Sequence, residues 1–98
     1  MSKPGFKITG HKGFHITFKN GYTVSVQFGP ANYCDNYHMN WGDPERKQIL
    51  ESSDAEVAVW GIGGELIDLP QFGNNGNVGA NFTPEMVFDL LSWAKEQK

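Results

Sequence analysis

Apolar and polar residues alternate on both sides of the pair Asn20-Gly21. Before the pair, every second residue from Phe14 to Phe18 is apolar, and after it the same holds from Tyr22 to Phe28. A period of two around an Asn-Gly pair is the strongest short-range signal for a β-hairpin. The pattern therefore predicts two antiparallel strands within residues 13–28.

The same pattern selects the register of this hairpin. A two-residue loop would place Phe18 opposite Thr23 and mix apolar with polar side chains, whereas a three-residue loop at 19–21 pairs Phe18 with Tyr22. Because a slip of one residue moves every side chain to the other face, we expect the three-residue loop, with Gly21 in a left-handed conformation. One face of the ribbon is then apolar, and the other carries His15, Thr17, Thr23, Ser25 and Gln27.

Further strands are predicted on both sides of the hairpin. Residues 6–9 form a short first strand, and residues 55–60 and 65–69 form a second hairpin around the glycine-rich turn 61–64. In residues 55–60, Val57 and Val59 share one face while the other holds Ala58 and Trp60. This pattern favours a strand that is covered on both faces or pressed against a neighbour at one edge.

The end of the chain carries the clearest helix signal. Thr83 is a good N-cap, Pro84 suits the first helical position, and Glu85 suits the positive end of the helix dipole. Apolar residues then recur at helical spacing, and others widen the stripe: Val87, Leu90, Leu91 and Ala94, with Met86, Phe88 and Trp93. We expect this helix to cover the apolar face of the first hairpin. A second, shorter helical segment is predicted over residues 44–51.

These elements predict an α+β fold in one domain, residues 1–98: an antiparallel β-sheet of about four to five strands, built from two hairpins and covered by one C-terminal α-helix. A net charge of −3 with eight Lys and Arg residues argues against a nucleic-acid polymer as partner. A single cysteine, no hydrophobic signal core at residues 1–5 and no membrane-length apolar run favour a cytoplasmic protein.

Two segments could contact a ligand. The Gly- and Asn-rich residues 71–81 lead into the final helix, so their amides and Asn side chains could meet phosphate or sugar. Residues 31–46 interleave aromatic and Asn side chains that could stack on a planar ring and read its edges. The alternatives are a turn-rich connection for the first segment, and for the second a loop pinned by its aromatics or a self-association surface. The candidate ligand-binding residues are Tyr33, Asn36, Tyr37, Trp41, Arg46, Asn74, Asn75 and Asn77.

Catalysis and metal binding receive little support. Cys34 and His38, with His11 and His15, are ligand types that zinc accepts, but their spacing matches no familiar site. We therefore expect no metal and no cofactor. No orienting partner marks Cys34 as a nucleophile, so a buried, inert cysteine is the default. Since no general base can be named either, we expect a protein that is not an enzyme.

Residues 13–36, GFHITFKNGYTVSVQFGPANYCDN, resemble the N-terminal motif of small uncharacterised proteins of tailed bacteriophages. The layout is also similar to that of the Thoeris anti-defence sponges, which are phage proteins with an antiparallel sheet and C-terminal helical structure. That family sequesters cyclic ADP-ribose-type immune signals uncleaved, in pockets shared between subunits. This chain is shorter and poor in arginine, so no site residue is taken over from the resemblance.

Together these observations suggest a homo-oligomeric phage counter-defence protein. It would bind a small nucleotide-derived signal, either of the cyclic ADP-ribose type or a cyclic oligonucleotide, in the host cytoplasm without converting it. The alternative is an inhibitor or accessory factor that binds a host protein through exposed aromatic loops.

Overall fold

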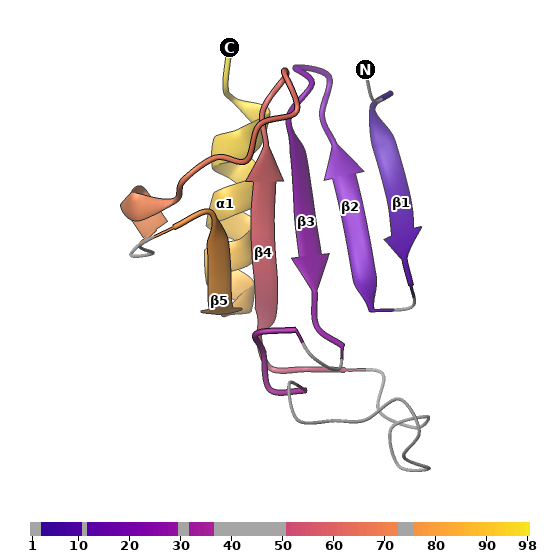
Figure 1. Ribbon diagram of the computed structural model, residues 1–98, viewed down its shortest axis with the longest axis vertical. Coiled ribbons are helices and arrows are strands. Elements are labelled where there is room, and N and C mark those ends of the chain that lie inside the picture. Colours follow the sequence, from indigo (N-terminus) through magenta and orange to yellow (C-terminus); the bar gives the residue numbers. More distant parts are fainter. Residues whose placement is uncertain (1–2, 11, 30–31, 37–50, 73–75) are drawn as a thin grey trace.

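A computed structural model of the protein describes residues 3–10, 12–29, 32–36, 51–72 and 76–98. Within these ranges, five antiparallel strands form one sheet in chain order, and one α-helix follows at the C-terminal end (Figure 1). This confirms the predicted α+β fold. The strands are β1 (Gly5–Thr9), β2 (Gly13–Thr17), β3 (Thr23–Gln27), β4 (Ala55–Trp60) and β5 (Val78–Phe82), and the helix is α1 (Pro84–Lys95).

The hairpin of β2 and β3 has the predicted register. Ile16 lies opposite Val24 and Phe14 lies opposite Val26, so apolar side chains pair across the two strands. The amide of Phe18 donates to the carbonyl of Tyr22 at 2.9 Å, which closes the three-residue connection. Gly21 has a φ of 91°, the left-handed conformation that this connection requires. The first strand is confirmed as β1, which pairs with β2.

The far edge of β4 differs from the prediction. Residues 65–69 were expected as a full strand, but only Leu66 forms a bridge, opposite Trp60. The remainder of that edge pairs with β5, which lies in the segment expected to be a loop. This strand was not predicted because Gly79 is typical of a loop. In the structure glycine is needed at this position, since a Cβ there would come within 2.7 Å of Val57 Cγ2. The missing side chain lets β5 approach the core, in which Phe82 is 2% exposed.

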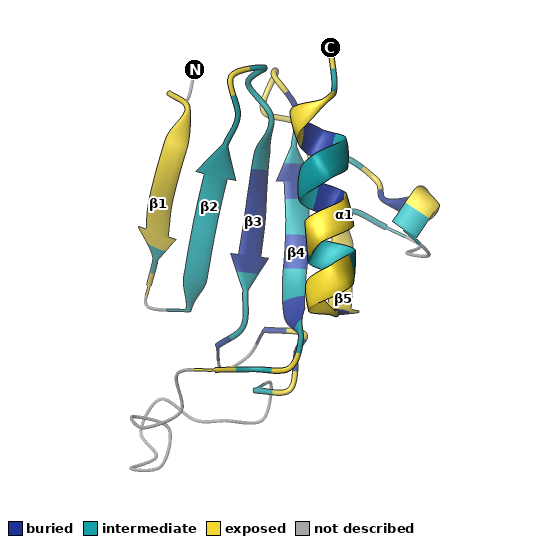
Figure 2. Cartoon of the chain, turned by 180° about the vertical axis from the view of Figure 1, so that it is seen from behind, coloured by how far each residue is buried: buried dark blue, intermediate teal, exposed yellow. Residues whose placement is uncertain are grey.

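The helix α1 begins as predicted. Thr83 Oγ1 accepts a hydrogen bond from the amide of Met86 at 3.2 Å, and Pro84 is the first helical residue. The helix packs on β3, β4 and β5, where its Leu90 and Ala94 are fully buried (Figure 2). Phe88, expected in the apolar stripe, is instead 68% exposed. No helix among the described residues is long and apolar enough to cross a membrane.

Asn20 ties the first hairpin to the end of α1. Its Nδ2 donates to the carbonyls of Ala94 and Gln97, both at 2.8 Å. Its Oδ1 accepts from the amide of Tyr22 at 3.0 Å. The side chain therefore binds carbonyls at and just beyond the C-terminal end of α1, and it links this end of the helix to the first hairpin.

Candidate functional site

The face of the sheet that is turned away from α1 carries mostly polar side chains; we call it the open face. Strand pairing aligns Lys7, His15, Ser25 and Ala58 across β1 to β4 in one row. The neighbouring row holds Thr17, Thr23 and Trp60. The polar face predicted for the hairpin is thus present, and β4 adds one large aromatic ring to it.

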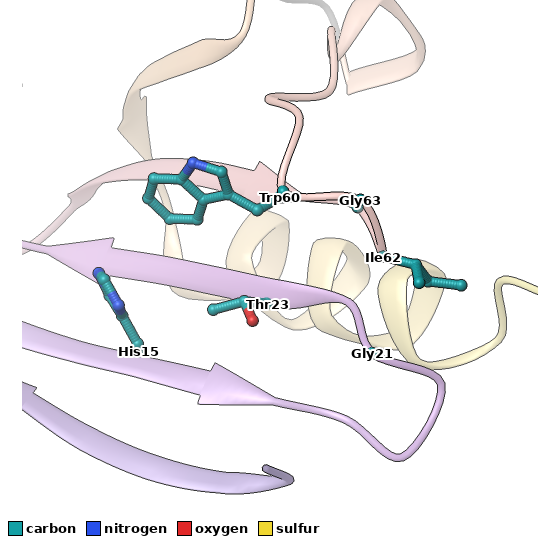
Figure 3. Close-up of a pocket in the computed structure, with 8 residues that line it drawn as sticks. His15, Gly21, Thr23, Trp60, Ile62 and Gly63 are labelled. Atoms are coloured by element: carbon teal, nitrogen blue, oxygen red, sulfur yellow. The ribbon is translucent and has the colours of Figure 1, made fainter. Parts of the chain in front are cut away.

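His15 and Trp60 meet above β3 on this face (Figure 3). Their ring centroids are 5.3 Å apart and the ring planes are inclined by 48°. Ser25, which lies between the two strands that carry these rings, is only 6% exposed. Burial lowers the pKa of His15, and the positive charge of Lys7 lowers it further. The imidazole is therefore neutral at neutral pH and presents a flat ring beside the indole.

Two hollows adjoin this ring pair. The larger has a volume of about 600 Å³ and lies between His15, Thr23, Trp60 and the turn that contains Ile62 and Gly63 (Figure 3). The smaller, of about 330 Å³, is lined by Lys3, which precedes β1, and by residues of β1, β2 and β3 that include Lys7. Both are lined by His15 and Thr23, so they form one trough along the open face. Its size is that of a small-molecule site.

One end of the trough is positively charged, because Lys3 and Lys7 line the end at β1. An anionic group would be stabilised there.

Hydroxyl groups occupy the middle of the trough. Thr17 Oγ1 and Thr23 Oγ1 are hydrogen-bonded to each other at 2.9 Å. Each oxygen keeps further capacity to donate or accept, which suits recognition of sugar hydroxyls. An aromatic end, a hydroxyl centre and a cationic end therefore follow one another along the face.

The residues predicted from the 31–46 loop have structural contacts where they are described. Asn36 donates from Nδ2 to the carbonyls of Phe28 at 2.6 Å and Glu51 at 3.1 Å. Tyr33 is half exposed, and its backbone amide donates to Glu56 Oε2 at 3.3 Å. The amide of Asp35 likewise donates to Asp54 Oδ1, so the described part of this loop lies beside two carboxylates, an unfavourable setting for a phosphate.

The two predicted loops contact each other through Tyr33 and through Asn81, which is not one of the candidate residues. The carbonyl of Tyr33 accepts from the amide of Asn81, near the end of β5. Asn77 immediately precedes β5, four residues earlier and hence about 13 Å away along the strand. Tyr37, Trp41, Arg46, Asn74 and Asn75 lie outside the described residues, as do residues 44–50 of the predicted helical segment 44–51.

The possible metal ligands give no site in the described ranges. No group of three or more His, Cys, Asp and Glu side chains could hold a metal ion there, and His11 and His38 lie outside these ranges. Cys34 is buried, its Sγ 3.7 Å from the carbonyl of Gly29. Burial raises the pKa of this thiol, which keeps it protonated and unreactive.

The trough was not predicted from the sequence. Trp60 reaches His15 only through the β3–β4 pairing, which no local pattern predicts. The lysines, in contrast, left a visible signal: residues 1–29 contain four lysines and no acidic residue, while residues 51–98 contain eight Asp or Glu and two Lys. The charge total of −3 hides this asymmetry between the two parts of the chain.

No family model matches the chain, and neither curated proteins nor solved structures give a significant match.

Proposed function

We propose that this protein binds and sequesters, without converting it, a small planar anion of the nucleotide-derived class. The observation that carries the proposal is the Trp60–His15 ring pair in a trough whose far end is lined by Lys3 and Lys7. Trp60 offers an aromatic surface for a base, and stacking of one base on an aromatic side chain contributes about 1–3 kcal/mol.

The remaining groups match the other parts of such a ligand. The hydroxyls of Thr17 and Thr23 suit a ribose, and Lys7 with Lys3 suits a phosphate. The base would thus lie over β4 and the phosphate over β1.

Sequestration rather than turnover fits the chemistry of this trough. The two threonine hydroxyls bond to each other, an arrangement that suits sugar recognition better than activation of a nucleophile. The resemblance of residues 13–36 to phage proteins supports a counter-defence role in the host bacterial cytoplasm, with the protein acting as a homo-oligomer. A panel of candidate ligands distinguishes a signal of the cyclic ADP-ribose type from a cyclic oligonucleotide.

Thermal unfolding of the purified protein with a panel of ADP-ribose isomers, cyclic ADP-ribose forms and cyclic nucleotides tests the proposal. A ligand at 100 times its Kd adds about 2.7 kcal/mol, which is a shift on the order of 10 °C for a chain of this size. We expect the ligand to be recovered chemically intact after heating. Converted ligand would show an enzyme, and no shift across the panel would overturn the proposal.

Two lysine variants locate the site. We expect Lys7→Gln to weaken binding at least several-fold, because it removes a cation from the trough. Lys19→Gln carries the same charge change in the connection after β2 and should leave the Kd unchanged within twofold. Equal loss in both variants would show a general effect of net charge rather than a site on the open face.

The second candidate is an inhibitor that binds a host protein. It is supported by Tyr33, which stands half exposed on the loop next to the acidic Asp35 and Asp54. Exposed aromatic side chains commonly anchor protein interfaces. This candidate requires the host protein for any binding signal, whereas the sequestration proposal requires only the purified chain and its ligand.

A further inference from the structure

The face of the sheet on the helix side is only partly covered. Because β1 and β2 pair Phe6 with Ile16 and Ile8 with Phe14, all four side chains point to the same side as the core residues of β3. The helix packs on β3 to β5, and Figure 2 shows β1 and β2 beside it without a cover. Phe6 and Ile8 are accordingly 81% and 76% exposed. We call these four residues the apolar strip.

A groove connects the apolar strip to the helix. It has a volume of about 530 Å³ and lies between Phe14 of β2 and Val87, Phe88 and Leu91 of α1. Phe88 projects from α1 at its margin and is 68% exposed. The helix therefore has an uncovered aromatic side chain directly beside an uncovered part of the sheet.

We propose that a second copy of this chain covers the apolar strip, with the α1 of each copy packed on β1 and β2 of the other. The dimensions agree with this occupant. Two strands span about 10 Å, which is the diameter of one helix, and five strand residues extend about 17 Å against about 18 Å for the twelve residues of α1. Since strip and helix lie side by side on one face, a two-fold axis between them makes both contacts at once and closes the dimer.

Three exposed apolar side chains supply about half of the area that one partner buries in a stable interface. Phe6, Ile8 and Phe88 together expose on the order of 400 Å² per chain, since a large aromatic side chain has about 150–250 Å² to bury. That is about half of the ~800 Å² per partner found in stable complexes. The half-buried groove residues and the surrounding polar rim supply contact area beyond these three side chains.

Pairing through the free edge of β1 would not achieve this cover. Side chains stand perpendicular to a sheet, so a β1-to-β1 contact would leave Phe6 and Ile8 exposed and would join two apolar strips into a wider one. A two-fold centred on the middle of β1 would also place Lys7 opposite its own copy, where like charges repel.

Sedimentation equilibrium of the full chain tests the dimer, which does not depend on the ligand proposal. We expect a dimer that Ile8→Glu converts to a monomer, while Ile62→Glu, the same change at a residue 51% exposed outside the strip, remains dimeric. A monomeric parent protein, or an Ile8→Glu variant that dimerises like the parent, would overturn the proposal. Ligand binding by Ile8→Glu, measured by thermal shift, separates the dimer proposal from the ligand proposal. A monomer that still binds ligand supports both proposals.

Disulfide trapping identifies the contact even if Ile8→Glu folds poorly. Equal amounts of Ile8→Cys and Phe88→Cys protein are mixed under mild oxidation, and we expect mainly the mixed disulfide. Buried Cys34 is present in every sample and serves as the internal control. Products dominated by Ile8→Cys joined to itself would show edge-to-edge pairing, and no trapping above the level of the parent protein would exclude the proposed contact.

Discussion

The side chain of Asn20 should be worth more to stability than its place in a surface turn suggests. It makes three hydrogen bonds, two from Nδ2 to the carbonyls of Ala94 and Gln97 and one through Oδ1 from the amide of Tyr22. A net value of about 0.5–1.5 kcal/mol each gives an upper range of several kcal/mol. Water can reach these part-buried groups once the side chain is removed, so we expect Asn20→Ala to lose about 2–3 kcal/mol.

Urea unfolding followed by circular dichroism measures this loss. The midpoint should fall while the slope of the free energy against urea stays unchanged, because the same surface is exposed on unfolding. In a thermal scan the loss corresponds to roughly 10–20 °C. Lys19→Ala, at the exposed neighbouring position, is the control and should change stability by less than about 0.5 kcal/mol.

Asn20→Asp separates the two halves of the contact. It keeps an acceptor for the Tyr22 amide but replaces the donor with a negative charge that faces two carbonyl oxygens. At neutral pH it should be at least as unstable as Asn20→Ala, and it should recover part of the difference below about pH 4, where the carboxyl gains a proton to donate. If Asn20→Ala loses less than about 0.5 kcal/mol, the side chain does not hold the helix end and the reasoning fails.

Two further predictions concern the open face and the core. The folded protein holds the pKa of His15 below its ordinary 6.5, so the unfolded chain is protonated first and the free energy of unfolding should decline as the pH falls from about 7 towards the lowered value. His15→Asn should show a smaller decline in urea titrations between about pH 8 and 5, and an identical decline in both proteins would contradict this. Gly79→Ala places a Cβ within 2.5 Å of Phe82 Cε1 and should cost about 1–3 kcal/mol in the same assay, whereas Ala80→Ser, at an exposed position, should be nearly neutral.

The elements that sequence reasoning predicted are those whose signals are local. The β2–β3 hairpin needs only its alternation and the glycine at position 21, and α1 needs only its cap and its helical spacing. The strand β5 has no such local signal, because glycine is typical of loops. The reason for Gly79 is its close approach to Val57 of β4, which the sequence does not show. The same holds for residues 65–69, which share the edge of β4 with β5 and form a single bridge.

The candidate site likewise combines a part with a local sequence signal and a part without one. The polar face of the first hairpin follows from the alternation, but its aromatic component comes from Trp60, 45 positions after His15. Asn20 reads as a turn former, yet its amide contacts a carbonyl 74 positions away. Composition alone predicted ligand contact for the aromatic and Asn-rich loops. Their described members Tyr33 and Asn36 make hydrogen bonds within the fold.

The two proposals use opposite faces of the same strands, and this has a consequence for stoichiometry. Alternating side chains of β1 and β2 place Lys7 and His15 on the open face and Phe6 and Ile8 on the helix side. A dimer that covers the helix side leaves both troughs on its outer surfaces, each complete within one chain. Ligand capacity is then one per chain in dimer and monomer alike. A stoichiometry of one ligand per two chains would contradict the trough and favour a site shared between subunits.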